Sequence, residues 1–294
     1  MKRYLVVYNP IAGKNNKKNW VDKLVKEIEK SGGRADLVTT EYVGHAREIS
    51  YRYAKDYDVL VSAGGDGTLN ELATGILEAK SKVVLGILPI GSGNDYYRNF
   101  ASPKDIKKAI DTIINGKIKM VDIGKGNSGR YLLNIASIGL DCLTVKKAKK
   151  LKKIFGGSLG YLFSLIYSIV VFKKQNLKIN IDDREIEAKS VLYCFGKGKS
   201  YGGGIRIMPW VDSSDGVFHM VNVVDVNKFI LILLSPSIAL WKHTVFKKYV
   251  KTYKAKKIKV ESEKTYDFNL DGEILENSNF IEYECIENAL GILV

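Results

Sequence analysis

Apolar runs alternate with amphipathic, helix-like segments through the first part of the chain. In chain order these are a strand-like run at 3–8, a helix-like run at about 19–30, a strand-like run at 34–39, a helix-like run at about 46–55 and a strand-like run at 58–62. A glycine-rich turn, a helix-like run and the apolar run "VVLGILPI" come next. We expect a further helix to begin at "SPKD", with Ser102 as its N-cap and Pro103 in its first turn. This repeat of strand and helix predicts a parallel sheet covered by helices.

The pattern changes near residue 125, where strand-like runs separated by turns begin to dominate. The runs are "YLLNIASI", "LKINID", "IEAKSVLYCF", "VFHMVNVV", "KIKVES" and "YDFNLDG". Helix-like segments are inserted among them, and no low-complexity linker precedes them. This pattern predicts a second, antiparallel β domain with a boundary near Gly124.

The segment 154–172 contains no charged residue and lies between lysines. On a helix, one face would carry Phe155, Leu159, Leu162, Ile166 and Val170, and another would carry Gly157, Tyr161, Ser164 and Ser168. Although the segment is long enough to cross a bilayer, these two faces favour a packed or interfacial helix. The lysine-rich stretch "KKAKKLKK" at 146–153 comes directly before it. This pairing predicts docking on anionic lipid, and a solvated basic face before a core helix is the alternative.

Composition adds a preference for anionic partners. The chain has 294 residues, of which 46% are hydrophobic, and a formal net charge of +14. This charge favours nucleic acid, phosphorylated metabolites or an acidic membrane surface, without choosing among them. The three cysteines form neither a disulfide framework nor a zinc pattern. We therefore expect a protein of the reducing cytoplasm.

Glycine-rich or acidic turns follow the strands of the first domain. They are "NPIAG" at 9–13, "GGDGTLNE" at 64–71, "PIGSGND" at 89–95 and "VDIG" at 121–124. Because the carboxyl ends of parallel strands meet at one sheet edge, these turns predict a site that binds an anion with backbone N–H groups. Each turn could instead be a tight loop with a capping side chain. "GKGNSG" at 124–129 also fits a dinucleotide fingerprint, but a strand follows it, which favours a hairpin turn.

The motifs "GGDGTLNE", "PIGSGND" and a late "DGE" resemble those of the soluble bacterial diacylglycerol and lipid kinases, relatives of the sphingosine and ceramide kinases. "GGDGT" alone is shared with NAD kinases and phosphofructokinases, whereas "GSGND" and "DGE" narrow the likeness to the lipid branch. The resemblance covers essentially the whole chain. It implies a Rossmann-like α/β nucleotide-binding domain at 1–124 and 281–294, where the tail returns, and an antiparallel β-sandwich lipid-substrate domain at 125–280.

The resemblance also implies ATP and Mg²⁺ as cofactors, and it gives roles to particular residues. Those expected to bind the nucleotide are Asn9, Pro10, Ala12, Gly13, Thr40, Gly64, Gly65, Gly67, Thr68, Asn70, Glu71 and Ser92. Asp66, Asp95 and Asp122 match a magnesium and water network. An aspartate among phosphate-binding amides would indeed repel the ligand without a cation between them. Glu273 matches the general base, and an exposed carboxylate at a hairpin turn is the alternative reading.

A second, structural metal is implied for the stretch "MPWVDSSDG". Asp215 would supply its side chain, and carbonyl groups near Asp212 and Val217 would complete the site. The family commonly has two acids before the glycine, whereas here the first of these positions is Ser214. A bare acidic turn is therefore an equal alternative.

Three functions remain open on the sequence. The leading one is an ATP-dependent lipid kinase that converts diacylglycerol to phosphatidic acid. Its partners would be a membrane lipid, an anionic membrane surface at the inner face of the cell membrane, and a second copy in a homodimer, but not a nucleic acid. The alternatives are a soluble-metabolite kinase of the NAD kinase type and a catalytically inactive membrane-binding module. The inactive module would tolerate loss of the acids, yet all four are present.

Overall fold

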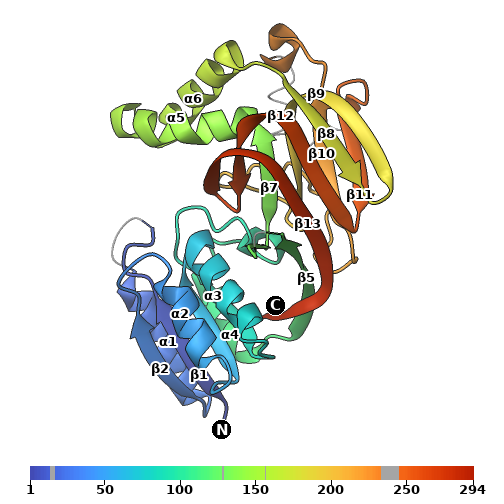
Figure 1. Ribbon diagram of the computed structural model, residues 1–294. Coiled ribbons are helices and arrows are strands. Elements are labelled where there is room, and N and C mark those ends of the chain that lie inside the picture. The colour runs from blue at the N-terminus through green and yellow to red at the C-terminus, as the bar shows by residue number, and fades with distance from the viewer. Residues whose placement is uncertain (14–16, 128, 156, 233–244) are drawn as a thin grey trace. The chain divides into compact units, whose positions relative to one another are not determined.

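The computed structural model describes residues 1–13, 17–127, 129–155, 157–232 and 245–294, with 149–155 and 157–162 described by their backbone alone. The chain forms two compact units (Figure 1). The first contains Met1–Ile123, Ser213–Asp215 and Ile286–Val294, and the second contains Gly124–Asp212 and Gly216–Cys285. The returning tail thus begins at 286 and not at the expected 281, because Ile281, Tyr283 and Cys285 belong to the core of the second unit.

A parallel sheet forms the centre of the first unit. Its strands are β1 (Arg3–Tyr8), β2 (Arg34–Thr39), β3 (Val59–Gly64) and β4 (Val84–Pro89). They lie in the order β2-β1-β3-β4, and the end of β13 (Glu273–Leu293) pairs in parallel with β4 through Ile292 and Leu85. The order 2-1-3-4 belongs to the second common doubly wound arrangement, whereas a Rossmann sheet would begin 3-2-1-4. The sequence of strand and helix alone could not distinguish the two.

Helices cover this sheet, as its buried hydrophobic strands require. They are α1 (Lys18–Lys30), α2 (His45–Tyr53), α3 (Asp66–Glu78) and α4 (Ile106–Asn115). Helix α1 packs with α4, and α2 packs with α3. The expected start of α4 is wrong: the cap is Asp105, whose side chain accepts the N–H of Lys108 at 2.9 Å, and not Ser102.

The second unit is built from strands that pair mainly in antiparallel fashion. They are β6 (Tyr131–Leu132), β7 (Ile135–Gly139), β8 (Gln175–Ile181), β9 (Arg184–Gly196), β10 (Phe218–Val224), β11 (Val250–Ala255), β12 (Lys257–Leu270) and most of β13. The second half of β9, residues 190–196, is buried on both faces. Tyr193 and Phe195 join one hydrophobic cluster, and Leu192 and Cys194 join another. The expected hairpin turn after Gly124 is confirmed, because β5 (Ile118–Gly126) pairs with β6.

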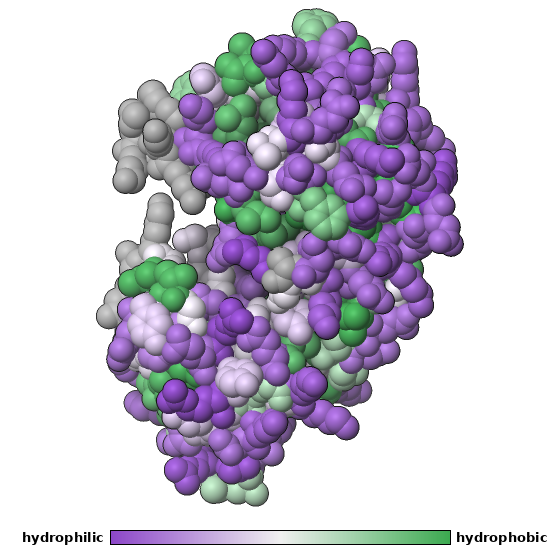
Figure 2. All heavy atoms as spheres, viewed as in Figure 1, coloured by the Kyte–Doolittle hydropathy of each residue, from purple (hydrophilic) through white to green (hydrophobic). Residues whose placement is uncertain are grey.

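The uncharged segment lies in two helices, α5 (Leu140–Phe155) and α6 (Gly157–Val171). Ser164 and Ser168 of α6 are fully buried, whereas Ile166 is 46% and Val170 is 55% exposed. The face with the small side chains packs on the protein together with Ile169, and large apolar side chains on the other face stay exposed. Within the described residues, neither helix is long and apolar enough to cross a membrane. Elsewhere, hydrophilic residues cover most of the visible surface (Figure 2).

The N-cap of α4 gives a direct test of this local structure. Replacing Asp105 by Ala should lower the free energy of unfolding by about 1 kcal/mol, because one N–H group at the start of α4 loses its acceptor. Differential scanning calorimetry would measure the change. The control is Ser102→Ala at the exposed residue nearby. An equal loss in both variants would contradict the assignment of the cap.

Candidate active site

The turns after β1, β3 and β4 meet at the carboxyl edge of the sheet. The N–H of Gly91 donates to the carbonyl of Gly64 at 2.9 Å. A Cβ atom on Gly91 would lie 2.3 Å from the Cα of Gly65, and one on Gly13 would lie 2.3 Å from the carbonyl oxygen of Ile90. Only glycine allows backbones to approach this closely. Three of the four predicted turns therefore meet in the structure, whereas the fourth stretch, 121–124, lies within strand β5 (Ile118–Gly126) and is not a turn.

The N-terminus of α3 opens into this edge. The helix begins at Asp66, directly after its N-cap residue Gly65. The first N–H groups of a helix have no acceptor within the helix, and they carry its positive end. A Cβ atom at Gly67 would meet no atom within 4 Å, so the space beside this turn is open. Such a helix end is suited to bind a phosphate group.

Two asparagines fasten the turns to one another. The amide of Asn9 donates to the hydroxyl of Thr68 at 2.9 Å, and its oxygen accepts the N–H of Ile11 at 3.1 Å. Asn94, which the sequence analysis left without a role, donates to the carbonyls of Pro89 and Gly91. It also accepts the N–H of Gly91 at 3.0 Å. The backbone of Asn94 is left-handed, with φ of 52°. Asparagine adopts this conformation more readily than most residues, so the asparagine in "GSGND" was the sequence signal for a turn-holding role.

Two of the predicted carboxylates converge beside Gly93. A Cβ atom at Gly93 would lie 2.9 Å from Oδ2 of Asp66 and 3.3 Å from Oδ2 of Asp95. The other oxygen of Asp66 accepts the N–H of Tyr96 at 3.0 Å. Oδ1 of Asp95 lies 3.5 Å from Nε of Arg98. Carboxylate oxygens are the ligands that Mg²⁺ prefers, so the pair fits a divalent cation.

Asp122 has a different environment from the one expected. It lies in β5, is 1% exposed, and its Oδ1 accepts the N–H of Asn288 at 3.0 Å. Its own N–H donates to the carbonyl of Ser213 at 2.8 Å. In the part of the chain that the structure describes, no three His, Cys, Asp or Glu side chains form a metal-binding group. The structure thus does not assemble the predicted group of three carboxylates, and Asp122 instead holds two distant segments together.

Glu71 was expected to bind the nucleotide, but its carboxylate has another use. Its two oxygens accept the N–H groups of Gly44 at 2.9 Å and Ala46 at 3.2 Å. Gly44 is the N-cap residue of α2 and has no side chain to do this. Glu71 therefore caps α2 from α3, and it fixes the segment that follows the buried Thr40. The partners lie 27 and 25 positions before Glu71 in the chain, so the sequence alone did not indicate this contact.

The other residues expected to bind the nucleotide lie on or next to these turns. Ala12 and Asn70 are partly exposed, and Pro10 and Ser92 are exposed. Gly64 is buried at the end of β3, where a Cβ atom would lie 2.5 Å from Oγ1 of Thr68. The Oδ1 of Asn70 accepts a hydrogen bond from the hydroxyl of Thr74 at 3.4 Å, so its side chain also has a contact within α3.

Glu273 lies in the second unit, directly after the turn that joins β12 to β13. Asp271 and Gly272 both have positive φ, as in a two-residue type I′ turn. The side chain of Glu273 is 66% exposed, and its Oε2 lies 4.0 Å from Nη1 of Arg130. The hairpin part of the alternative reading is therefore correct, and a catalytic role is compatible with it.

Asp271, which the sequence analysis passed over, holds this turn in place. Its carboxylate accepts the N–H groups of Leu133, Asn134 and Ile135 at 2.8, 2.9 and 2.9 Å. Asn269 accepts the N–H of Gly272 at 3.0 Å. This anchoring restricts where Glu273 can lie.

A buried carboxyl supports the same turn from within. The amide of Asn269 lies 3.4 Å from Oδ2 of Asp141, and the hydroxyl of Ser137 donates to that oxygen. Burial raises the pKa of Asp141. The hydrogen bonds from Ser137 and Asn269 favour its charged form and oppose this shift.

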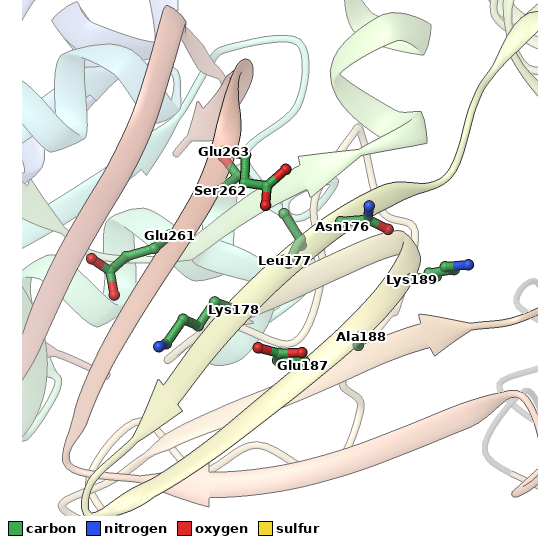
Figure 3. A pocket seen from close by; sticks show the side chains of 9 residues that line it. All are labelled: Asn176, Leu177, Lys178, Glu187, Ala188, Lys189, Glu261, Ser262 and Glu263. Carbon is green, nitrogen blue, oxygen red and sulfur yellow. The ribbon is translucent and has the colours of Figure 1, made fainter.

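A cavity of about 690 Å³ opens elsewhere in the second unit, between β8, β9 and β12 (Figure 3). Three glutamates and two lysines are among its lining residues, which are Asn176, Leu177, Lys178, Glu187, Ala188, Lys189, Glu261, Ser262 and Glu263. This charged lining does not suit an acyl chain. None of the predicted site residues lines it.

Comparison with known proteins is consistent with both units. Residues 3–126 match the model of the diacylglycerol kinase catalytic domain. Residues 134–294 match the YegS C-terminal NAD kinase beta sandwich-like domain. A crystal structure of a diacylglycerol kinase from Bacillus anthracis is similar in fold, with a TM-score of 0.75 at 24% identity, over 99% of this chain and 96% of that one.

Curated relatives agree with these matches. A diacylglycerol kinase of Staphylococcus saprophyticus is 36% identical over 92% of this chain and 89% of the relative. Diacylglycerol kinases of Staphylococcus epidermidis and Staphylococcus aureus are each 34% identical, over 92% of this chain and 86% of the relative. The chain therefore belongs to the diacylglycerol kinase family and is a lipid kinase.

Proposed function

We propose that this protein transfers the γ-phosphate of ATP to the hydroxyl group of diacylglycerol, which gives phosphatidic acid. The observation that carries the proposal is the convergence of Asp66 and Asp95 beside Gly93, next to the N-terminus of α3. The relatives named diacylglycerol kinase support this choice of lipid. Phosphoryl transfer depends mainly on positioning and charge neutralisation, and this edge of the sheet offers both.

The nucleotide phosphates would bind at the start of α3. The N–H groups of Gly65, Gly67 and Thr68 would donate to them. Asp66 and Asp95 would hold Mg²⁺, which neutralises phosphate charge when it is bound. Asp122 would act indirectly, because its contacts with Asn288 and Ser213 hold the returning segments against β5.

Glu273 would act as the general base. It would accept the proton of the lipid hydroxyl as that oxygen bonds to the γ-phosphorus and ADP leaves. Its exposure keeps the carboxylate accessible to a substrate, and the contacts of Asp271 keep its backbone in place. Nη1 of Arg130 lies 4.0 Å from Oε2 of Glu273, so a guanidinium adjoins the proposed base.

A soluble-metabolite kinase is the second candidate, because the second unit matches a domain described as NAD kinase beta sandwich-like. NAD is therefore the substrate that an assay must include. The name of that domain is its only support, since the curated relatives carry the lipid kinase name.

The membrane surface is the proposed partner, and α6 supplies the apolar contact. Its exposed side chains are Phe163, Ile166, Tyr167, Val170 and Val171, between 43% and 55% accessible. The ammonium of Lys147 lies 5.0 Å from the ring centre of Tyr167, so a positive charge adjoins this face. A helix with such a face beside basic residues is typical of interfacial binding.

One of the lysines expected to dock has a structural role. Lys146 forms ion pairs with Asp267 at 2.8 Å and Glu276 at 2.7 Å. These carboxylates neutralise its charge and raise the pKa of its ammonium. We therefore assign docking to Lys147 together with Lys149 and Lys150, whose side chains lie outside the described residues.

The proposed reaction is tested by offering radiolabelled ATP with diacylglycerol, a panel of other lipid alcohols, and NAD. We expect label in phosphatidic acid and none in NADP.

Asp66→Asn should lower turnover by at least about 10²-fold, because an amide binds Mg²⁺ far less well while still accepting the N–H of Tyr96. Asp56→Asn, at an exposed aspartate, is the matched control. Preferred labelling of NAD would overturn the proposal, and a variant within about tenfold of wild type would remove the metal assignment of Asp66.

Glu273→Gln tests the general base. The amide keeps the size of the side chain but cannot accept the proton, so kcat should fall by roughly 10²- to 10⁴-fold. Nucleotide affinity should stay the same. Glu263→Gln, at an exposed position of β12, is the matched control. Normal turnover with weakened ATP binding would instead make Glu273 a binding residue.

Membrane docking is tested with sedimentation of vesicles that contain anionic lipid. Each lysine near such a surface contributes about 1 kcal/mol, and the attraction is screened over about 8 Å at physiological salt. Reversal of Lys147, Lys149 and Lys150 to glutamate should abolish sedimentation and activity on vesicles. Activity on a dispersed short-chain lipid should survive.

The control for docking reverses Lys104, Lys107 and Lys108, which are exposed at or near the start of α4. This variant should sediment as wild type does. Equal losses in both triple variants would mean that net charge, and not α5, determines binding. If the reversal of Lys147, Lys149 and Lys150 also abolishes activity on the dispersed lipid, then α5 is needed for catalysis or for folding.

A further inference from the structure

A fully buried lysine contacts the loop expected to hold a structural metal. Lys197 directly follows β9 and is 1% exposed. Its ammonium donates a hydrogen bond to the carbonyl oxygen of Val217 at 2.7 Å. That carbonyl is one of the groups expected to bind the metal, together with Asp212 and Asp215. Lysine is almost never fully buried without partners, because burial removes its charge from water.

The backbone of Lys197 is held as firmly as its ammonium. Its N–H donates to the carbonyl of Asn134 at 2.9 Å, and the N–H of Gly198 donates to the same oxygen at 3.0 Å. A Cβ atom at Gly198 would lie 1.6 Å from Oδ1 of Asn134, so no other residue fits there without a shift. The path of the lysine from β9 to Val217 is therefore set by the fold.

These contacts do not fit a resident divalent ion. Mg²⁺ and Ca²⁺ bind oxygen at about 2.0–2.6 Å and need six or more oxygen ligands. An ion on the oxygen of Val217 would lie close to the ammonium, and the two positive charges would repel each other. The groups expected to bind the metal also carry little negative charge, because the position before Asp215 is Ser214 and not a second acid.

We propose that the Lys197 ammonium replaces the structural metal in this protein. It supplies the positive charge that the loop would otherwise take from an ion, and it links the end of β9 to the carbonyl just before β10. Because the charge is part of the chain, the loop needs no metal to keep its conformation. The contact between Lys197 and Val217 lies within the second unit, and the inference stands apart from the proposed reaction.

The test measures metal content and thermal unfolding without nucleotide. Wild-type protein dialysed against EDTA should contain no divalent ion by mass spectrometry. The Tm of Asp66→Asn, which lacks one of the two proposed Mg²⁺ ligands of the active site, should be the same in EDTA, Mg²⁺ and Ca²⁺. Lys197→Met should lower the Tm by at least about 3 °C, because the carbonyl of Val217 loses its partner. Lys189→Met, at an exposed lysine of β9, is the matched control and should leave the Tm unchanged.

A double variant tests the replacement itself. Lys197→Met with Ser214→Asp removes the ammonium and supplies the second acid, so its Tm should rise when Ca²⁺ is added. The Asp66 and Asp95 carboxylates are the same in every variant, so a difference between variants reports on the loop. A divalent ion retained by both the wild-type protein and Asp66→Asn, or a Tm that falls in EDTA for both proteins, would overturn the inference. The wild-type measurements decide the question even where a variant fails to fold.

Discussion

The contact between the turns after β3 and β4 is the constraint on which the candidate active site depends. Gly91 and Gly65 approach so closely that a Cβ atom on Gly91 would lie 2.3 Å from the Cα of Gly65. Because β1 and β3 are neighbours in the order 2-1-3-4, the first turn joins them at the same edge. Parallel strands thus bring three distant motifs together, and glycine lets them touch.

Most of the polar side chains in the glycine-rich and acidic turns hold neighbouring backbone in place and take no part in the proposed reaction. Asn94 and Asn9 hold turns, Glu71 caps a helix, and Asp271 anchors a hairpin. The groups left to act on charge are the carboxylates of Asp66 and Asp95 and the first N–H groups of α3. This division explains why so many polar residues are needed for a reaction that requires mainly placement and neutralisation.

Much of the fold could be predicted from the sequence because the spacing of hydrophobic residues and the glycine-containing turns determine the structure of short stretches of the chain. The strands of the first unit, the change of pattern near Gly124 and the meeting of the turns follow from them. The role of Glu71 could not, because its partners lie 27 and 25 residues away. The cap of α4 was misplaced because Ser102 and Asp105 are equally good caps in isolation. In α6 the buried face combines Ser164 and Ser168 with Ile169, whereas Ile166 and Val170 stay exposed, and the two faces read from the sequence did not show which of them packs on the protein.

In the proposed reaction, a divalent cation joins the nucleotide to the carboxylates of Asp66 and Asp95 beside Gly93. Gly93→Ala tests it most directly, because the added methyl would lie 2.9 and 3.3 Å from the two carboxylate oxygens. Isothermal titration calorimetry would compare the affinities for ATP with and without Mn²⁺. The variant should bind Mn²⁺–ATP at least about tenfold more weakly, with metal-free ATP affinity and Tm nearly unchanged. Equal affinity of the variant and the wild-type protein for Mn²⁺–ATP would contradict it.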